Sequence, residues 1–169
     1  LAIFGTGNFD PTKFFNFQTI LFDVKEGLDN IITPSGAIET SFTIAPGVTL
    51  DLTQGGTFAS NEDDREIEVG GTVNGDVDLG DGENTTFTMG EGAIVTGSIN
   101  GGSSGSSVLV LNLGGQMGNH IAQFKEAKIT TPGLDQPLNL TGTIIVVDTV
   151  TLVGGAVKLN GNLTVPKVA

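Results

Sequence analysis

Residues 73–77 read Val73-Asn74-Gly75-Asp76-Val77, and 22 positions later residues 95–99 read Val95-Thr96-Gly97-Ser98-Ile99. Each copy has an apolar residue, a spacer, a glycine, a spacer and a second apolar residue. Steps of 22, 23 and 19 residues lead to three more copies: Met117-Gly118-Asn119-His120-Ile121, Leu140-Thr141-Gly142-Thr143-Ile144 and Leu159-Asn160-Gly161-Asn162-Leu163. In the first of these three an asparagine replaces the central glycine. A nearly constant step of this size, made of short apolar strands and Gly/Asn turns, predicts stacked coils.

The same spacing extends toward the N-terminus. A step of 23 residues back from Val73 reaches Leu50, and a further 22 reach Leu28-Asp29-Asn30-Ile31-Ile32. Apolar residues also alternate with polar ones inside the repeat, which turns every second side chain inward. We therefore predict an all-β fold: a right-handed, single-stranded parallel β-helix, a solenoid of about eight coils, with room for a less regular C-terminal cap.

The amino-acid composition agrees with this fold class and argues against partners that carry negative charge. The chain has 169 residues, with 7 Lys plus Arg against 19 Asp plus Glu and a net charge of -12, so we expect no nucleic-acid or anionic-lipid partner. Its 26 glycines and 38% hydrophobic content suit neither a disordered chain nor a helical one. The absence of Cys excludes disulfides and thiolate metal sites. No apolar run is long enough to span a bilayer as a helix, so we expect no membrane insertion by this chain.

We predict one β-helix over residues 1–169, in three parts. Residues 1–24 form a Phe-rich first coil, residues 25–69 form irregular coils with an acidic, solvated loop at 61–66, and residues 70–165 form the regular repeat. Because the chain begins at Leu1 without a Met or a signal peptide, we expect a fragment of a larger protein.

Two segments inside the regular repeat need a choice of structure. The segment from Val108 to Leu113 is apolar at nearly every position, which predicts a strand covered on both sides. The segment from His120 to Ala127 has apolar residues at steps of three, but it is short and in register with the repeat, so we predict a strand there too.

Catalytic chemistry has little support. The single histidine, His120, lies inside the repeat, and the segment from Ser103 to Ser107 has the composition of a flexible loop, so no serine is expected to be held beside a base. Asp76 and Asp78 alternate with Val77, so they share an outward face of a strand, where acidic residues usually serve solubility. We predict that the chain is not an enzyme, has no catalytic residues and binds no cofactor.

Calcium is the one metal that we consider, and it is a weak candidate. Four oxygen donors surround Gly80 and Gly82 and faintly resemble the glycine-rich turns that bind calcium between β-helix coils. Those sites need the motif in tandem, and the next turn supplies serines instead. The candidate calcium ligands are Asp78, Asp81, Glu83 and Asn84.

The order of three motifs resembles a known family. The motifs are the run Gly75 to Phe87, then Gly97-Ser98-Ile99-Asn100-Gly101-Gly102 followed by Val108-Leu109-Val110-Leu111, and then Ile121 to Glu126 leading to Leu138-Asn139-Leu140-Thr141-Gly142-Thr143 and the closing Val157-Lys158-Leu159-Asn160-Gly161. Together they make residues 70–165, a little over half the chain, similar to the C-terminal part of the passenger domains of bacterial autotransporters. These are secreted surface proteins of the type V class with a pertactin-like β-helix. The chain departs from that family at Ser103-Ser104-Gly105-Ser106-Ser107, where the family often has an acidic residue.

The resemblance implies a role and a location. The region next to the outer-membrane barrel is called the autochaperone, which is thought to fold first outside the cell and to template the coils above it. The implied function is a non-enzymatic structural module that templates passenger folding during secretion and supports a distal adhesive or virulence region. The implied partners are the upstream coils and the C-terminal outer-membrane β-barrel of the parent chain, at the surface of a Gram-negative bacterium.

Two alternatives from other classes remain open. One is a bactofilin-like β-helical subunit, which would be a whole cytosolic protein that forms filaments. The other is a polysaccharide-binding or lyase β-helix. Against a lyase stands the lack of the basic cluster that an acidic polymer would require.

Overall fold

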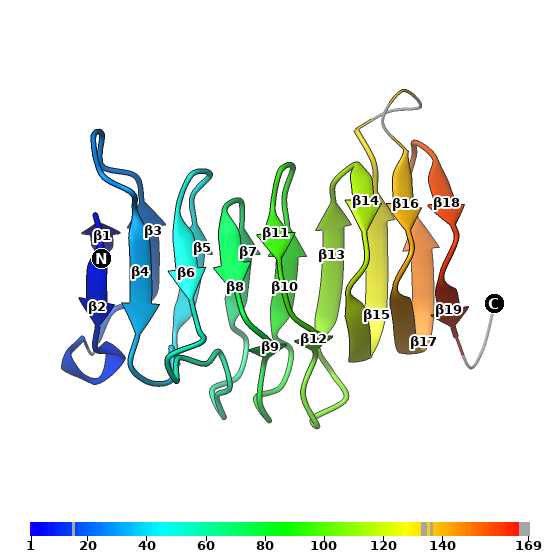
Figure 1. The fold of residues 1–169 in the computed structure, drawn as a ribbon. Helices are drawn as coiled ribbons and strands as arrows, with labels where there is room; N and C mark the ends of the chain where they lie inside the picture. The colour runs from blue at the N-terminus through cyan, green and yellow to red at the C-terminus, as the bar shows by residue number, and fades with distance from the viewer. Residues whose placement is uncertain (15, 133–134, 136, 166–169) are drawn as a thin grey trace.

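The structure, a computed structural model, describes residues 1–14, 16–132, 135 and 137–165. Parallel strands stack into a β-solenoid of about seven turns, which confirms the predicted fold class, one turn fewer than the eight expected. In Figure 1 the chain rises at the back, descends in front and advances from left to right, so the coil is right-handed. The only helical element among the described residues is the 3-10 turn η1 (Pro11–Lys13).

Three faces surround the core, and we name them by their place in Figure 1. The back face contains β1 (Ala2–Phe4), β3 (Thr19–Asp23), β5 (Ser41–Ile44), β7 (Glu66–Val69), β10 (Thr86–Met89), β13 (Val108–Asn112) and the later parts of β15 (His120–Thr130) and β17 (Thr143–Leu152). The front face contains β2 (Gly7–Phe9), β4 (Ile31–Pro34), β6 (Thr49–Asp51), β8 (Thr72–Asn74), β11 (Ile94–Val95), β14 (Gly115–Met117), β16 (Leu138–Leu140) and β18 (Val157–Leu159). The third face contains β9 (Val77–Asp78), β12 (Ile99–Asn100), the beginnings of β15 and β17, and β19 (Asn162–Thr164).

The third face has strands only from the fourth turn of the solenoid onward, which contains β7, β8 and β9. In the earlier turns loops replace them, and the single bridge there among the described residues joins Ala37 to Thr57. The long strand β15 then serves two faces: it pairs with β12 at Ile121 and with β13 from Glu126. Between these two contacts Gln123 has a φ of 61°, and the register shifts there, so the strand turns the corner without ending.

The repeat found in the sequence is the true strand register. Val77, Ile99, Ile121, Ile144 and Leu163 follow one another as paired residues along the third face. The extension to the N-terminus is wrong at its last step. Leu50 pairs with Ile32, 18 residues earlier, and Leu28 is 47% exposed. The reason is that the chain between β3 and β4 projects as a loop, which carries Leu28 out of the coil.

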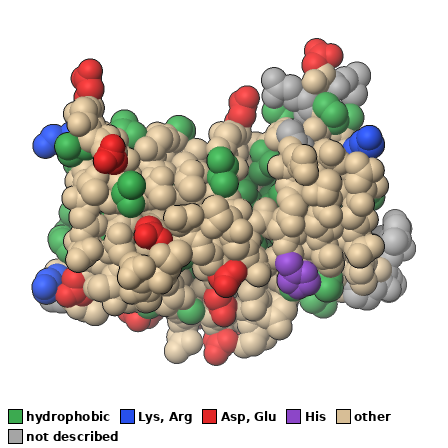
Figure 2. Space-filling view, viewed as in Figure 1, with side chains coloured by type: hydrophobic (Ala, Val, Ile, Leu, Met, Phe, Trp, Pro, Cys, Tyr) green, Lys and Arg blue, Asp and Glu red, His purple; other side chains and the backbone are tan. Residues whose placement is uncertain are grey.

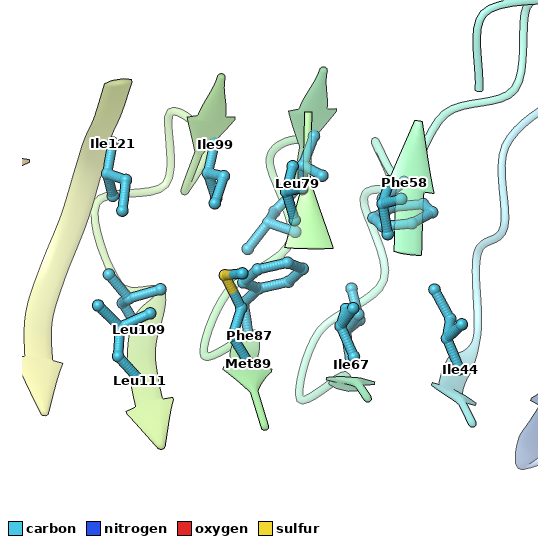
Figure 3. Packing of buried hydrophobic residues seen from close by; sticks show 14 of the residues in the cluster. Ile44, Phe58, Ile67, Leu79, Phe87, Met89, Ile99, Leu109, Leu111 and Ile121 are labelled. Atoms are coloured by element: carbon cyan, nitrogen blue, oxygen red, sulfur yellow. The ribbon is translucent and has the colours of Figure 1, made fainter. Parts of the chain in front are cut away.

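Each turn packs its inward side chains on those of the next turn. On the back face the column Ile44, Val69, Met89, Leu111 and Ile129 is buried throughout. In Figure 3, Ile44, Met89 and Leu111 of this column face Phe58, Leu79, Ile99 and Ile121 across the core. The core is therefore a stack of apolar layers, in which each layer depends only on its two neighbours.

The Phe-rich start of the chain contributes rings to the core and also covers its N-terminal end. The ring of Phe42 contacts Phe58 and Phe22, Phe22 contacts Phe9, and the centroids of Phe9 and Phe14 are 5.1 Å apart in a stacked arrangement. Phe9, Phe22, Phe42 and Phe58 are buried, whereas Phe14 is 38% exposed. The inner rings therefore fill the core, and Phe14 lies over its N-terminal end.

The two ambiguous segments of the regular repeat are both strands. His120 to Ala127 lies within β15, as predicted. The prediction that the segment from Val108 to Leu113 is covered on both sides is wrong, because Val108 and Val110 are only half-buried on the outside. Their β-branched side chains continue the outer surface of the back face.

The central glycines of the repeat are needed for close stacking. A Cβ on Gly97 would lie 2.5 Å from the carbonyl oxygen of Gly75 in the preceding turn. A Cβ on Gly142 or Gly161 would approach the backbone of the preceding turn even more closely. These glycines mark corners where one turn rests directly on another.

Candidate functional site

The acidic loop contains one residue that the sequence prediction placed wrongly. Its acidic side chains are exposed, as expected, but Arg65 is only 2% exposed. The Arg65 guanidinium donates hydrogen bonds to the carbonyl oxygens of Ile38 at 3.0 Å and Leu79 at 2.7 Å. It thereby joins the loops of the turns on both sides of its own. The Nε of Arg65 is buried without a hydrogen-bond partner.

Arg65 stays charged despite its burial. Desolvation lowers the pKa of its guanidinium, and the carboxylates of Glu39 and Glu62 act in the opposite direction. Because the ordinary pKa of arginine is so high, the side chain remains a cation near neutral pH. A buried cation needs partners for its donors, and here the two backbone carbonyls supply them.

Arg65→Ala is expected to destabilise the protein by about 3 kcal/mol, because it removes two buried hydrogen bonds, takes the donor from the Ile38 carbonyl oxygen and leaves a void. Arg65→Lys should recover only part of the loss, since an ammonium lacks the planar fork that reaches both carbonyls. Urea unfolding of the three proteins measures the effect. Equal stability of wild type and Arg65→Ala would show that Arg65 does not hold these loops.

A cavity of about 740 Å³ lies where loops replace the strands of the third face. Phe14 and Phe17 give it an apolar side, Glu39 and Glu62 line it as carboxylates, and Arg65 contributes to its wall. The volume is typical of small-molecule sites. Its carboxylates outnumber its cation, so the cavity disfavours an acidic polymer, as the net charge of the chain does.

The first two candidate calcium ligands lie together on the third-face side. The Asp78 carboxylate accepts a hydrogen bond from the backbone N–H of Gly80 at 2.9 Å, and the Asp81 carboxylate accepts one from the hydroxyl of Ser103 in the next turn. Both acids line a polar pocket of about 420 Å³. In this position they support turns within and between coils.

The other two candidate ligands face a neighbouring loop. The backbone N–H of Glu83 donates to the Asp63 carboxylate at 2.8 Å, and the side-chain amide of Asn84 donates to the Asp64 carboxylate at 3.1 Å. Neither residue lines the pocket that contains the first pair. Within the described part of the chain, no three His, Asp or Glu side chains gather as a metal ion would require.

Calcium binding stays a prediction that isothermal titration tests. A site at these turns should release or absorb heat on calcium addition and raise the melting temperature. The absence of both effects in millimolar calcium would contradict the prediction. Asp78→Asn is the informative variant, because it keeps an oxygen that can accept from Gly80 and removes only the charge.

His120 and the paired aspartates, Asp76 and Asp78, lie on the third-face side of the solenoid. His120 is exposed at the start of β15 and lines a shallow pocket with Asp76. The Asp76 carboxylate accepts a hydrogen bond from the backbone N–H of Ser98 at 2.7 Å. Asp76 and Asp78 therefore each support a turn.

The front face is interrupted once. Its five-stranded sheet ends at β11 and a separate three-stranded sheet begins at β14, although the back strands β10, β13 and β15 pair without a break. Asn119, the residue that replaces glycine in the repeat, lies at this interruption. Its side-chain amide donates to the carbonyl oxygens of Val95 and Gly97, both at 2.7 Å. The sequence pattern showed the exception, and only the structure shows what it does.

These features define a β-solenoid in which acidic residues outnumber basic ones. No family model matches the chain, and no curated protein or solved structure is significantly similar to it. No helix of the described residues is long and apolar enough to cross a membrane.

Proposed function

We propose that the chain is a structural module of a surface-displayed autotransporter passenger, with no catalytic activity. Its task is to fold, to template the folding of adjoining coils during secretion, and to hold a distal adhesive or virulence region away from the cell. Its partners would be the neighbouring coils of the same passenger and the outer-membrane β-barrel of a Gram-negative bacterium. The support comes from the ends of the solenoid and from the order of motifs over residues 70–165.

The observation that carries the proposal is that the strand ladder is open at both ends. At one end β1 and β2 each pair on one side only among the described residues. At the other end β18 and β19 each pair on one side only within the same part of the chain. There the apolar side chains Leu152 and Leu159 are 58% and 50% exposed. Unpaired strand edges over apolar side chains are surfaces onto which another coil can add.

Templating follows from the one-dimensional contacts of the solenoid. A new turn gains strand hydrogen bonds on one or more faces and buries its apolar layer in a single step. Its partner turn is already ordered, so the entropy cost falls on one turn only. A folded segment therefore lowers the barrier for the turn that follows or precedes it.

Deletion of residues 70–165 from the full-length protein tests the proposal. The expected result is poor secretion or degradation at the cell surface, because the remaining coils lose their template. Protease resistance of surface-displayed protein gives the readout. A deleted protein that is displayed, folded and protease-resistant would refute the templating role. Deletion of a stretch of similar length from the distal region is the matched control.

The open ends also suit a second candidate, a bactofilin-like polymer subunit. In that case the two ends of separate copies would pair with each other and build filaments. Sedimentation and electron microscopy of the purified chain separate the two functions. Filaments that grow from the purified chain at physiological salt would favour the polymer, whereas a monomer favours the passenger module.

A further inference from the structure

The interruption of the front face leaves two strand edges opposite each other. We call the space between β11 and β14 the notch. Within the described residues β11 pairs only with β8, and β14 pairs only with β16. In Figure 1 the back strand β13 is visible between β11 and β14, and no front strand is drawn there. Facing edges of this kind carry unused backbone donors and acceptors.

Asn119 explains why the two strands do not close on each other. At the equivalent corners of other turns, glycine lets one turn rest directly on the backbone of the preceding turn. A side chain at that position cannot fit there. Asn119 instead extends its amide toward the preceding turn and binds the carbonyl oxygens of Val95 and Gly97. One amide thus stands in for part of the missing strand ladder.

The notch also bears an exposed apolar side chain. Ile94 of β11 is 54% exposed. The other exposed large hydrophobic residues of the described chain fall within residues 1–31 or 145–159, toward the ends of the solenoid. Hydrophobic side chains are visible in the middle of the face in Figure 2. The exposure of Ile94 therefore does not come from its being at an end of the solenoid, and Ile94 is a candidate apolar contact for a partner.

The charge around the notch has one sign. A pocket of about 400 Å³ adjoins β11 at Val95, and its lining includes Asp76, Thr96, Ser98, Asn119 and His120. No Lys or Arg lines this pocket among the described residues. Glu91 is exposed in the turn that precedes β11. A partner that fits both ends of β11 therefore carries positive charge.

We propose that the notch is a strand-addition site for an extended, cationic peptide segment of a partner protein. The peptide backbone pairs with the free edges of β11 and β14, as in other cases of β-augmentation. An apolar side chain of the peptide covers Ile94, and a Lys or Arg side chain lies near Asp76. The Asn119 amide keeps the carbonyl oxygens of Val95 and Gly97 hydrogen-bonded until a peptide N–H takes its place. This inference does not rest on the proposed passenger function.

The probe is the acetylated peptide amide Thr-Val-Lys-Val-Lys-Thr, titrated into the isotope-labelled protein and followed by backbone amide NMR shifts. We expect saturable shifts confined to β11, β14 and Asn119. Replacing the second valine of the peptide by proline removes a backbone N–H and should abolish the shifts. Replacing both lysines by glutamate should do the same through repulsion. Ile94→Lys in the protein should weaken binding at least about tenfold, because it adds like charge and removes the apolar contact.

Ile145→Lys is the matched control, since Ile145 is also exposed, at 37%, but lies in β17. It should leave the binding unchanged, and circular dichroism checks that both variants fold. Asn119→Gly supplies a second variant, which should let β14 close on β11 and exclude the peptide. Failure of the peptide to bind, equal binding of the proline peptide, or equal loss in both isoleucine variants would overturn the proposal. So would dimerisation of the protein that Ile94→Lys abolishes, because the notch would then belong to a second copy.

Discussion

Gly142→Ala is expected to destabilise the protein by about 3 kcal/mol or more, and the variant is expected to be largely unfolded at 37 °C. The added methyl group would overlap the carbonyl oxygen of Asn119 and the backbone of Gly118 in the preceding turn. Backbone atoms cannot move aside as a flexible side chain does. The turn must therefore lift away, and it would lose strand hydrogen bonds on both sides of the corner. Urea unfolding followed by circular dichroism measures the loss.

Gly36→Ala is the matched control for this prediction. A Cβ at Gly36 meets no atom within 4 Å, and its backbone is not in the left-handed region. We expect its stability to change by less than about 1 kcal/mol, with stabilisation as the favoured direction. If the two alanine variants unfolded at the same urea concentration, the close stacking at Gly142 would not be a stability determinant.

Phe42→Ala is expected to cost about 3–5 kcal/mol, the usual range for removing a buried aromatic ring. Phe42 is fully buried, and its ring contacts Phe22 at a centroid distance of 5.9 Å and Phe58 at 4.7 Å. The void would lie inside a stack of layers, where the neighbouring turns cannot collapse inward because their backbones are paired. Thermal and urea unfolding should both show the loss.

Phe4→Ala controls for loss of an aromatic residue as such. Phe4 lies in β1 and is 54% exposed, so its truncation removes little buried area. A change below about 1 kcal/mol is expected. A large effect at Phe4 together with a small effect at Phe42 would mean that the terminal turn, and not the aromatic stack, determines stability.

The period of the sequence predicted most of the strand register. Only glycine fits where the backbones of two turns touch, so glycine recurs in the sequence at these corners. Gly97 and Gly142 each mark a corner. The third-face column is paired from Val77 to Leu163, whereas the front-face column that begins at Leu50 is interrupted between Val95 and Met117, because β11 and β14 do not pair. The prediction failed at Leu28, where Asn30 stands at the central position of the motif and a loop of different length separates β3 from β4. A longer surface loop costs little free energy, so the number of residues between two strands can change without a change in the strands themselves, and a fixed period then fails.

Arg65 was missed for a different reason. It lies next to a run of acidic residues, and a charge run usually indicates solvent. A signal was nevertheless present, since Ile67 and Val69 point inward and a period of two places Arg65 on the same side. Alternation deserved more weight than charge at this position. The carbonyls of Ile38 and Leu79 that bind it could not have been identified without the structure.

The stacking of turns along one axis has a mechanical consequence. All strands lie across the long axis, so a force applied at the two termini would peel the solenoid one turn at a time. Each released turn of 22 residues would add on the order of 75 Å of contour length. Neighbouring turns are held together by ladders on two or three faces, and the turn that contains Asn119 keeps its back and third-face ladders to its predecessor. Under load, release would therefore begin at the terminal turns, whose outer strand edges are unpaired among the described residues.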